Sequence, residues 1–403
     1  MTSTASRSEN TVPDGKARKH GQRPSRNGGK KKPGSGANTQ GTGPQDTVAP
    51  YAALDLGTNN CRLLIAKPLP RGFRVIDAFS RIVRLGEGMS RTGAISDAAM
   101  DRAISALRVC RDKLETRHVG RARLIATEAC RIASNGEEFL ERVRDATGLD
   151  LEIVDRETEA RLAVSGSASL VDREADGAMI FDIGGGSTEL IWLDQTKSSR
   201  KSPLTAHRRI GGWTSVPLGV VKLSEMFGGE RVTPEIFEAM VAETLKYLDD
   251  FGGGHAAKAS MDDGGNIHLL GTSGTVTTLA GVYLDLPRYD RRRVDGVWLQ
   301  RADMMDVTQR LLNLTHEERQ LNGCIGTERA DLVLPGCAIL EAICRSWPCE
   351  RLRVADRGLR EGILTTLMAE DGVWLRHRRR PRRNRGGGRT GRANGGTTPA
   401  STA

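Results

Sequence analysis

The sequence predicts an α/β protein built from two similar lobes with a cleft between them. An apolar strand ending in Asp, a turn of Gly and small polar residues, and a second apolar strand occur together twice, at 51–65 and 178–193. A third apolar run, 268–270, leads through a Gly/Thr/Ser turn into a predicted helix. Apolar strands alternating with amphipathic helices are typical of sheets covered by helices. Two related hairpins far apart in the chain indicate two lobes that hold one ligand.

The second hairpin has the clearest chemical pattern, with three glycines between two acids. Glycines let backbone N–H groups approach a ligand closely, and consecutive N–H groups form a concave anion site. The carboxylates of Asp182 and Glu189 flank the turn and are ligands of the kind that Mg²⁺ prefers. A Gly-rich hairpin with a solvated acid at each end remains the alternative. The predicted phosphate-binding residues here are Gly184, Gly185, Gly186, Ser187 and Thr188.

The first hairpin and the third turn extend this pattern. Asp55 ends the first strand, and Arg62 lies on the strand that follows the turn. The third turn precedes a helix, whose free N–H groups and positive dipole end favour a phosphate. The predicted phosphate-binding residues of these two segments are Asp55, Gly57, Thr58, Asn59, Arg62, Gly271, Thr272, Ser273 and Gly274.

The other predicted elements complete the two lobes. Ser96 is a suitable N-cap for a helix over 97–117, whose apolar residues recur at helical spacing. The triple glycine at 252–254 is expected to end a helix and open a loop, and 200–207 is expected to be an exposed loop. The first lobe, 50–165, also has predicted strands at 73–82, 123–127 and 151–154 and helices at 137–147 and 157–167. The second lobe, 166–375, has predicted helices at 219–227, 234–248, 302–313, 316–323, 328–345 and 357–368 and a strand at 352–354.

The positive charge of the chain lies at its two ends. The net charge is +10, but residues 1–49 carry +6 and residues 376–403 carry +9, so the body between them carries −5. Both ends are polar and basic with almost no apolar residues, a composition that does not fold. We therefore expect disordered basic tails. They either aid solubility or bind polyanions non-specifically in a salt-dependent manner.

The cysteine and histidine patterns exclude several classes of protein. The seven cysteines are an odd number without a Cys-x-x-Cys pair, and the seven histidines show no metal-ligand spacing. Both facts argue against a zinc site. Unpaired thiols favour a reducing compartment, so a cytoplasmic protein is expected. No apolar run approaches the roughly 20 residues that a membrane span needs.

In combination, these motifs resemble the exopolyphosphatase and guanosine pentaphosphate phosphohydrolase family of the actin-like phosphotransferase superfamily. The resemblance covers residues 50–370, and it implies two actin-like (ribonuclease H-like) lobes in a short two-domain form. It also implies a homodimer. The segments that carry the resemblance are 55–59, 157–162, 182–189, 271–275, 328–331 and 358–362.

The resemblance also implies a reaction. Water would cleave the terminal phosphoanhydride bond of inorganic polyphosphate or of guanosine pentaphosphate, with Mg²⁺ or another divalent cation. Glu159 is the expected catalytic base, because 157–162 resembles the helix that carries the catalytic carboxylate of the family. Position 60 is Asn where many relatives have a small hydroxyl residue, so one phosphate contact is expected to differ.

Several alternatives remain open. Arg62, Arg84 and Arg131 are candidates for charge-assisted contacts to phosphate, but each is equally consistent with an ion pair inside a lobe. An actin-like kinase or ATPase would need an adenosine pocket and an acceptor site. A polyphosphate- or RNA-binding protein would act through the tails and lose salt-sensitive binding without them. The carboxylates at 159, 182 and 189 argue against this last class.

Overall fold

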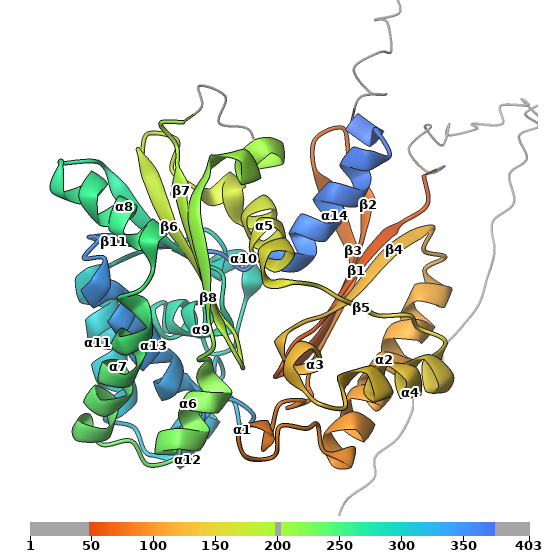
Figure 1. Cartoon of the computed structure of the whole chain (residues 1–403), viewed down its shortest axis with the longest axis horizontal. Helices are drawn as coiled ribbons and strands as arrows, with labels where there is room; N and C mark the ends of the chain where they lie inside the picture. The colour runs from red at the N-terminus through yellow and green to blue at the C-terminus, as the bar shows by residue number, and fades with distance from the viewer. Residues whose placement is uncertain (1–47, 198–202, 375–403) are drawn as a thin grey trace, which may run out of the picture. The chain divides into compact units, whose positions relative to one another are not determined.

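Two mixed β-sheets flanked by helices form the described part of the protein (Figure 1). The computed structural model describes residues 48–197 and 203–374, and all its helices and strands belong to one unit of the chain, Thr47–Ala403. The predicted tails, 1–49 and 376–403, fall almost entirely outside the described residues. Within the described ranges, no helical segment has the length and hydropathy that a bilayer span requires.

The first half of the body contains five strands and the helices that follow them. In chain order these are β1 (Tyr51–Leu56), β2 (Asn60–Pro68), β3 (Phe73–Ile82), α1 (Met89–Thr92), α2 (Asp97–Thr116), β4 (Arg121–Ala126), α3 (Glu128–Ile132), α4 (Gly136–Thr147), β5 (Glu152–Ile153), α5 (Arg156–Ser167) and the 3₁₀ turn η1 (Ala168–Leu170).

The second half contains the other sheet. Its elements are β6 (Gly177–Ile183), β7 (Thr188–Asp194), the 3₁₀ turn η2 (Pro203–Arg209), β8 (Ile210–Val216), α6 (Val220–Phe227), α7 (Pro234–Leu248), α8 (Gly252–Asp262), β9 (Ile267–Gly271), α9 (Gly274–Tyr283), α10 (Arg291–Val294), β10 (Trp298–Gln300), α11 (Arg301–Leu312), α12 (His316–Leu321), α13 (Val333–Ser346), β11 (Arg351–Val354) and α14 (Leu359–Glu370).

The two sheets have the same topology. The first has the strand order β3-β2-β1-β4-β5, and the second has β8-β7-β6-β9-β11 with β10 added at the edge. In both, the first three strands form an antiparallel meander, and the fourth and fifth run parallel to the first. This repeat confirms the predicted fold class of two actin-like lobes.

The central strands are buried on both faces, which explains their continuous apolar runs. Alternate residues of a strand point to opposite faces. Ala52 and Leu54 of β1 therefore alternate with Ala53: the first two join a core with α2 and α4, and Ala53 joins a core with α5 and α14. In the second sheet, Phe181 of β6 faces the core that contains α7 and α13, and Ile180 faces α5.

Helix α5 thus packs against both sheets, and α14 lies beside it (Figure 1). The two helices cross closely because each has a glycine at the contact. A Cβ atom at Gly166 would collide with the carbonyl of Gly358, and one at Gly362 would collide with the carbonyl of Leu162. This crossing fixes the position of the helix that carries Glu159.

The structure differs from the predicted elements in a few places. The triple glycine at 252–254 opens α8 instead of a loop. Helix α13 begins at Val333 rather than 328, since the carbonyl of Arg329 accepts the N–H groups of Leu332 and Val333 in a turn (both 3.0 Å). Part of the expected loop at 200–207 is the 3₁₀ turn η2, and its residues 200–202 lie outside the described residues. The lobe boundary at 165/166 stays a prediction.

Candidate active site

The first predicted phosphate loop is the turn between β1 and β2. The N–H of Gly57 donates to the carbonyl of Asn60 (2.9 Å) and closes the turn. The carbonyls of Asn59 and Thr58 accept the N–H groups of Val83 and Gly86 (2.8 and 2.9 Å), in the segment after β3. The N–H groups of Thr58 and Asn59 have no backbone acceptor among the described residues, so they are available to an anion.

The second predicted loop joins β6 and β7 and has the same design. The N–H of Gly184 donates to the carbonyl of Ser187 (2.9 Å), and the carbonyls of Gly184 and Gly185 accept the N–H groups of Val220 and Val221 at the start of α6 (3.0 and 2.9 Å). No acceptor within the described ranges receives the N–H groups of Gly185 or Gly186. This loop therefore also presents free donors.

The two loops touch each other, and only glycine permits this approach. A Cβ atom on Gly185 would lie 3.1 Å from the Cβ atoms of Thr58 and Asn59. One on Gly186 would lie 2.8 Å from the hydroxyl oxygen of Thr58. Glycine at both positions thus lets the phosphate loops of the two lobes form one surface.

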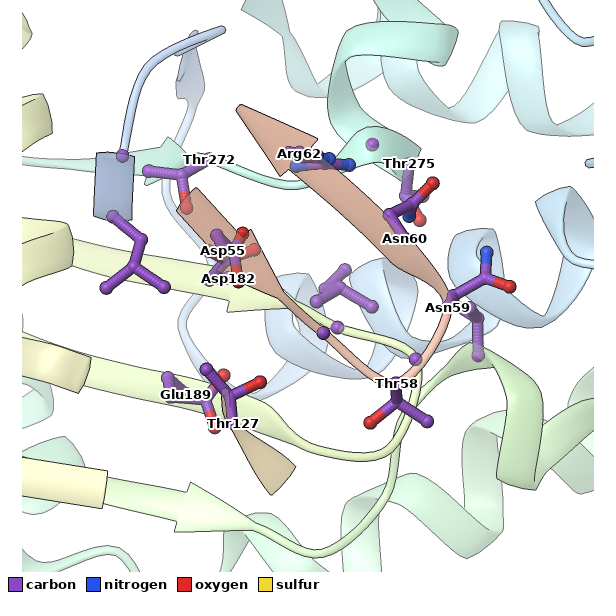
Figure 2. Close-up of a pocket in the computed structure, with 18 of the residues that line it drawn as sticks. Asp55, Thr58, Asn59, Asn60, Arg62, Thr127, Asp182, Glu189, Thr272 and Thr275 are labelled. Carbon is purple, nitrogen blue, oxygen red and sulfur yellow. The ribbon is translucent and has the colours of Figure 1, made fainter. Parts of the chain in front are cut away.

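Most of the predicted site residues line a single cavity between these loops, the third turn and the start of α14 (Figure 2). In the close-up, Arg62 lies near Asp55 and Asp182, while Thr58 and Asn59 lie on the turn between β1 and β2. The predicted residues that line the cavity are Asp55, Gly57, Thr58, Asn59, Arg62, Glu159, Asp182, Gly184, Gly185, Gly186, Ser187, Glu189, Thr272 and Gly274.

Five predicted phosphate ligands are not among the lining residues. Thr188 donates its hydroxyl to the carbonyl of Leu218 (2.7 Å), and Ser273 caps α9 by accepting the N–H of Val276 (3.1 Å). Gly271 is the last residue of β9. Arg84 and Arg131 form ion pairs with Asp331 and with Glu128 and Glu159. The geometry therefore gives Arg84 and Arg131 partners other than phosphate.

Three arginines that line the cavity, Arg329, Arg357 and Arg360, were missed by sequence reasoning, and of these Arg357 is paired with Asp295. Arg329 follows α12, and Arg360 lies in the first turn of α14. Within the described ranges neither has a carboxylate within ion-pair distance, and the same holds for Arg62. Burial lowers the pKa of Arg329, as does the nearby Arg62, and burial lowers the pKa of Arg360. Three cations without partners favour an anionic ligand.

Asp55 and Asp182 are partly buried carboxylates at equivalent positions, one residue before the ends of β1 and β6. Burial raises the pKa of both, and the nearby Arg62 opposes this rise. In the described part of the chain, no three His, Cys, Asp or Glu side chains are close enough to hold a metal alone. Mg²⁺ usually keeps several waters and binds one or two carboxylates plus substrate phosphate, so the pair still fits such an ion.

Glu189 lies opposite Asp182 in the β6/β7 ladder. Its Oε1 accepts the hydroxyls of Ser187 (2.7 Å) and Ser215 (2.9 Å). Burial raises the pKa of Glu189 to about 7, although these hydrogen bonds favour the ionised form. One oxygen is thus already satisfied by protein, which leaves the other for a metal or water.

Glu159 belongs to a partly buried cluster of alternating charges. Arg131 donates to Glu159 (3.2 Å) and to Glu128 (2.6 Å), and Arg156 donates to Glu128 (2.7 Å). Burial raises the pKa of Glu159 well above its usual value, and the nearby Glu189 adds to this rise. Burial also opposes ionisation of Glu128, but its two arginines outweigh it and lower its pKa. Glu128 lines the cavity too and was missed by sequence reasoning.

Comparison with known proteins agrees with this geometry. Exopolyphosphatase 2 of Mycobacterium tuberculosis is 28% identical over 333 residues, which cover 78% of this chain and 98% of that protein. The crystal structure of the Ppx/GppA family member from Aquifex aeolicus has a TM-score of 0.63 and 28% identity, over 80% of this chain and 98% of the other. An exopolyphosphatase structure from Cytophaga hutchinsonii has the same fold, with a TM-score of 0.69 and 24% identity over 80% of this chain and 98% of the other.

A match to a protein-family model identifies the family of this chain. The model of the Ppx/GppA phosphatase family matches residues 64–371, which begin within β2 and include the whole second sheet and the cavity residues from Thr127 onward. The cavity chemistry, with N–H loops, unpaired arginines and buried carboxylates, is what the cleavage of a phosphoanhydride bond requires. The chain belongs to the Ppx/GppA phosphatase family and is a hydrolase of phosphoanhydride bonds.

Proposed function

We propose that the protein releases terminal orthophosphate from inorganic polyphosphate by Mg²⁺-assisted attack of water. The observation that carries this proposal is the meeting of two N–H loops, three unpaired arginines and buried carboxylates in one cavity. Phosphoryl transfer depends mainly on positioning and on neutralising charge. A terminal phosphate with its high negative charge is the ligand that such a lining suits.

The composition of the cavity wall favours a simple phosphate chain. Among the described residues that line it there is no aromatic side chain on which a base could stack. Polyphosphate presents only phosphate groups, which the arginines and N–H groups match. Guanosine pentaphosphate remains the alternative substrate, because its 5′ end offers the same anhydride and its base could stay outside the cavity.

Each group has a proposed part in the reaction. The loops at 57–59 and 184–187 hold the oxygens of the terminal phosphate, and Arg62, Arg329 and Arg360 neutralise their charge. Glu159 orients the attacking water and accepts its proton as the new P–O bond forms. The bridging P–O bond breaks, the shortened chain leaves with the bonding electron pair, and Glu159 later returns the proton to solvent.

A divalent cation fits the same wall. Asp182 and Glu189 would hold it, with Asp55 reaching it through water. The amide oxygens of Asn59 and Asn60 are buried without a hydrogen-bond partner among the described residues, and water bound to a cation would satisfy such acceptors. When bound, the cation supplies charge neutralisation for the transferring phosphoryl group.

The cysteines bear on the location of the protein. All seven lie in the described ranges and are free and buried. Free thiols persist where disulfides are kept reduced. We therefore place the protein in the cytoplasm. We also keep the homodimer implied by the family resemblance as a proposal.

Phosphate release tests the proposal directly. The wild-type protein is incubated with polyphosphate or with guanosine pentaphosphate, with and without Mg²⁺, in the absence of ATP and of any acceptor. We expect Mg²⁺-dependent release of orthophosphate, fastest from polyphosphate, and loss of this activity in Asp182→Asn. Release only in the presence of ATP and an acceptor would favour the kinase. Salt-sensitive binding without release would favour a protein that acts through its tails.

A further inference from the structure

A bidentate ion pair connects elements of the two halves of the body beside the cavity. The two terminal nitrogens of Arg84 donate to the two carboxylate oxygens of Asp331, both at 3.0 Å. One of them also donates to the carbonyl of Glu328 (3.2 Å). Side-by-side guanidinium–carboxylate pairs combine strength with a defined geometry. Both terminal nitrogens of Arg84 therefore donate to protein acceptors.

The backbone of Arg84 is attached to the first phosphate loop. The N–H groups of Arg84 and of its neighbour Val83 both donate to the carbonyl of Asn59 (3.1 and 2.8 Å). Arg84 has a left-handed backbone, with φ of 46°. Such a conformation is uncommon for a residue with a side chain and is held in place by its surroundings. The backbone of Arg84 is thus held in a fixed position next to Thr58 and Asn59.

The other end of the pair lies in the turn that carries Arg329. This turn covers 328–332, and the carbonyl of Arg329 accepts the N–H groups of Leu332 and Val333. The carbonyl of Asp331 accepts the hydroxyl of Ser224 (3.3 Å) on α6. Arg84 thus contacts the turn at Glu328 and Asp331, which lie on either side of the cavity-lining Arg329.

A second contact joins the same two regions. The carboxylate of Glu225 on α6 accepts the N–H of Gly88 (2.8 Å) and the hydroxyl of Ser90. The start of α6 holds the carbonyls of Gly184 and Gly185 in the second phosphate loop. Both contacts therefore start in the segment after β3 that hydrogen-bonds to the first phosphate loop. One ends in the turn that carries Arg329, and the other ends on α6, which hydrogen-bonds to the second phosphate loop.

We propose that the Arg84–Asp331 pair is a clasp that sets the position of Arg329 relative to the first phosphate loop. Arg84 is then a positioning residue for the substrate's phosphate groups and acts through Arg329. This inference rests on the proposed phosphohydrolase function for its kinetic effect. The structural part of the proposal is that the ion pair fixes the distance between the two halves of the body, and this part does not depend on the substrate.

Kinetics of phosphate release from polyphosphate test the clasp. Arg84→Met and Asp331→Asn should each raise KM about tenfold, within the roughly 5- to 150-fold range typical of coupling between sites, and should change kcat less. Arg329→Met should raise KM as well. Adding Arg84→Met to Arg329→Met should then have little further effect, because residues acting through one group are not additive. Additive effects of the two substitutions would overturn the proposal.

A matched control separates the clasp from the loss of any ion pair. Arg345 forms a similar bidentate pair with Glu238 (2.7 and 2.8 Å), but both residues lie within the second half, on α13 and α7. Arg345→Met should leave KM unchanged. If it raises KM as much as Arg84→Met does, the effect is one of general stability and the clasp is wrong.

A distance measurement tests the clasp without activity. The native cysteines are all buried, so spin labels can be attached through Arg108→Cys on α2 and Ala239→Cys on α7, two exposed positions. The distribution of label distances in the full chain should be narrow and should broaden in Arg84→Met but not in Arg345→Met. An unchanged distribution in Arg84→Met would contradict the clasp. Absence of phosphate release by the wild type would instead contradict the proposed function.

Discussion

At the scale of single residues, the surroundings of two neighbouring carboxyls shift their pKa values in opposite directions. Glu128 is flanked by Arg131 and Arg156, which outweigh burial and lower its pKa, so it stays ionised. Glu159 has one arginine contact, at 3.2 Å, and its pKa is raised by burial and by Glu189. A carboxyl with a raised pKa is the better proton acceptor near neutral pH.

The first prediction concerns Glu159 as the proposed base. Glu159→Gln keeps the shape of the side chain and removes its ability to take a proton from water. We expect kcat for phosphate release to fall roughly 10²–10⁴-fold with little change in KM. The control is Glu157→Gln on the same helix, because Glu157 is exposed and paired with Arg161 at 2.6 Å. Full activity of Glu159→Gln would show that another group is the base, with Glu128 as the next candidate.

The second prediction concerns pH and Glu189. Burial raises its pKa from 4.5 to about 7 in the folded protein. A raised carboxyl pKa contributes stability that is complete below about pH 4.5 and is lost as the pH rises through about 7. Glu189→Gln removes this loss of stability because Gln does not ionise. Its neutral amide oxygen can still accept the hydroxyls of Ser187 and Ser215.

The measurement is thermal unfolding of both proteins in EDTA at pH 5 and pH 8. We subtract the free energy of unfolding of the wild type from that of Glu189→Gln at each pH. This difference should be larger at pH 8 than at pH 5 by on the order of 2–3 kcal/mol. Other buried carboxyls titrate in both proteins, so the difference between the two reports the charge of Glu189 together with its effect on the pKa of Glu159. The same relative stability at both pH values would mean that the pKa of Glu189 is not raised.

The sequence located the acids of the cavity better than its cations. Asp55, Asp182 and Glu189 stand next to glycine turns, and that local pattern is visible in the chain. Arg329 and Arg360 lie in segments noted for family resemblance, but nothing local tells a free arginine from a paired one. The partners of Arg84 and Arg131 depend on residues up to 247 positions away in the chain, so only the folded structure reveals them.

At the scale of elements, the crossing of α5 and α14 supports the site. Helix α5 carries Glu159, and the segment that leads into α14 contributes Gly358 and Arg360 to the cavity. The glycines at the crossing let the two backbones approach, so a side chain there would separate the helix of the proposed base Glu159 from a segment that lines the cavity. The N-cap Asp155, which accepts the N–H of Thr158 (2.7 Å), fixes the start of α5.

The third prediction tests the crossing. Gly166→Ala places a methyl group against the backbone of Gly358 and Gly362, so one of the two helices must shift. Such overpacking typically costs about 1–3 kcal/mol. We expect a lower midpoint of urea unfolding together with slower phosphate release. Gly252→Ala at the start of α8 is the control, because no atom lies within 4 Å of the added Cβ. A Gly166→Ala protein as stable as the control would show that the helices can separate without cost.

Elements with strong local signals were predicted to the residue or close to it. Helix α7 begins after Thr233, whose hydroxyl accepts the N–H of Ile236, and has Pro234 at its first position, a common N-terminal signature. Strand β3, 73–82, was also predicted correctly. By contrast, three glycines conceal the start of α8, and β10 has only three residues, so packing against the sheet rather than local sequence determines both.

At the scale of the whole molecule, charge is divided between the body and the ends of the chain. The body carries −5, yet its cavity gathers three arginines that have no carboxylate partner in the described part of the chain, so attraction for a polyanion is local there. The ends carry +6 and +9. A long polyphosphate chain whose terminus enters the cavity leaves the rest of its length available to these ends. Chemistry and polymer capture would then belong to different parts of one chain.

The last prediction separates these two contributions. Residues 378–380, 382 and 383 are all arginine. Their combined replacement by Gln in the full chain should weaken binding of long polyphosphate and make its salt dependence shallower, since fewer counterions are released. Release of phosphate from tripolyphosphate should keep its kcat, because every cavity residue lies between 55 and 361. Replacement of the same arginines by Lys is the control and should preserve the salt dependence. Equal salt dependence of the Gln and Lys proteins would show that these five arginines do not contact the polymer, and its capture would then fall to the body or to the other basic residues of the ends.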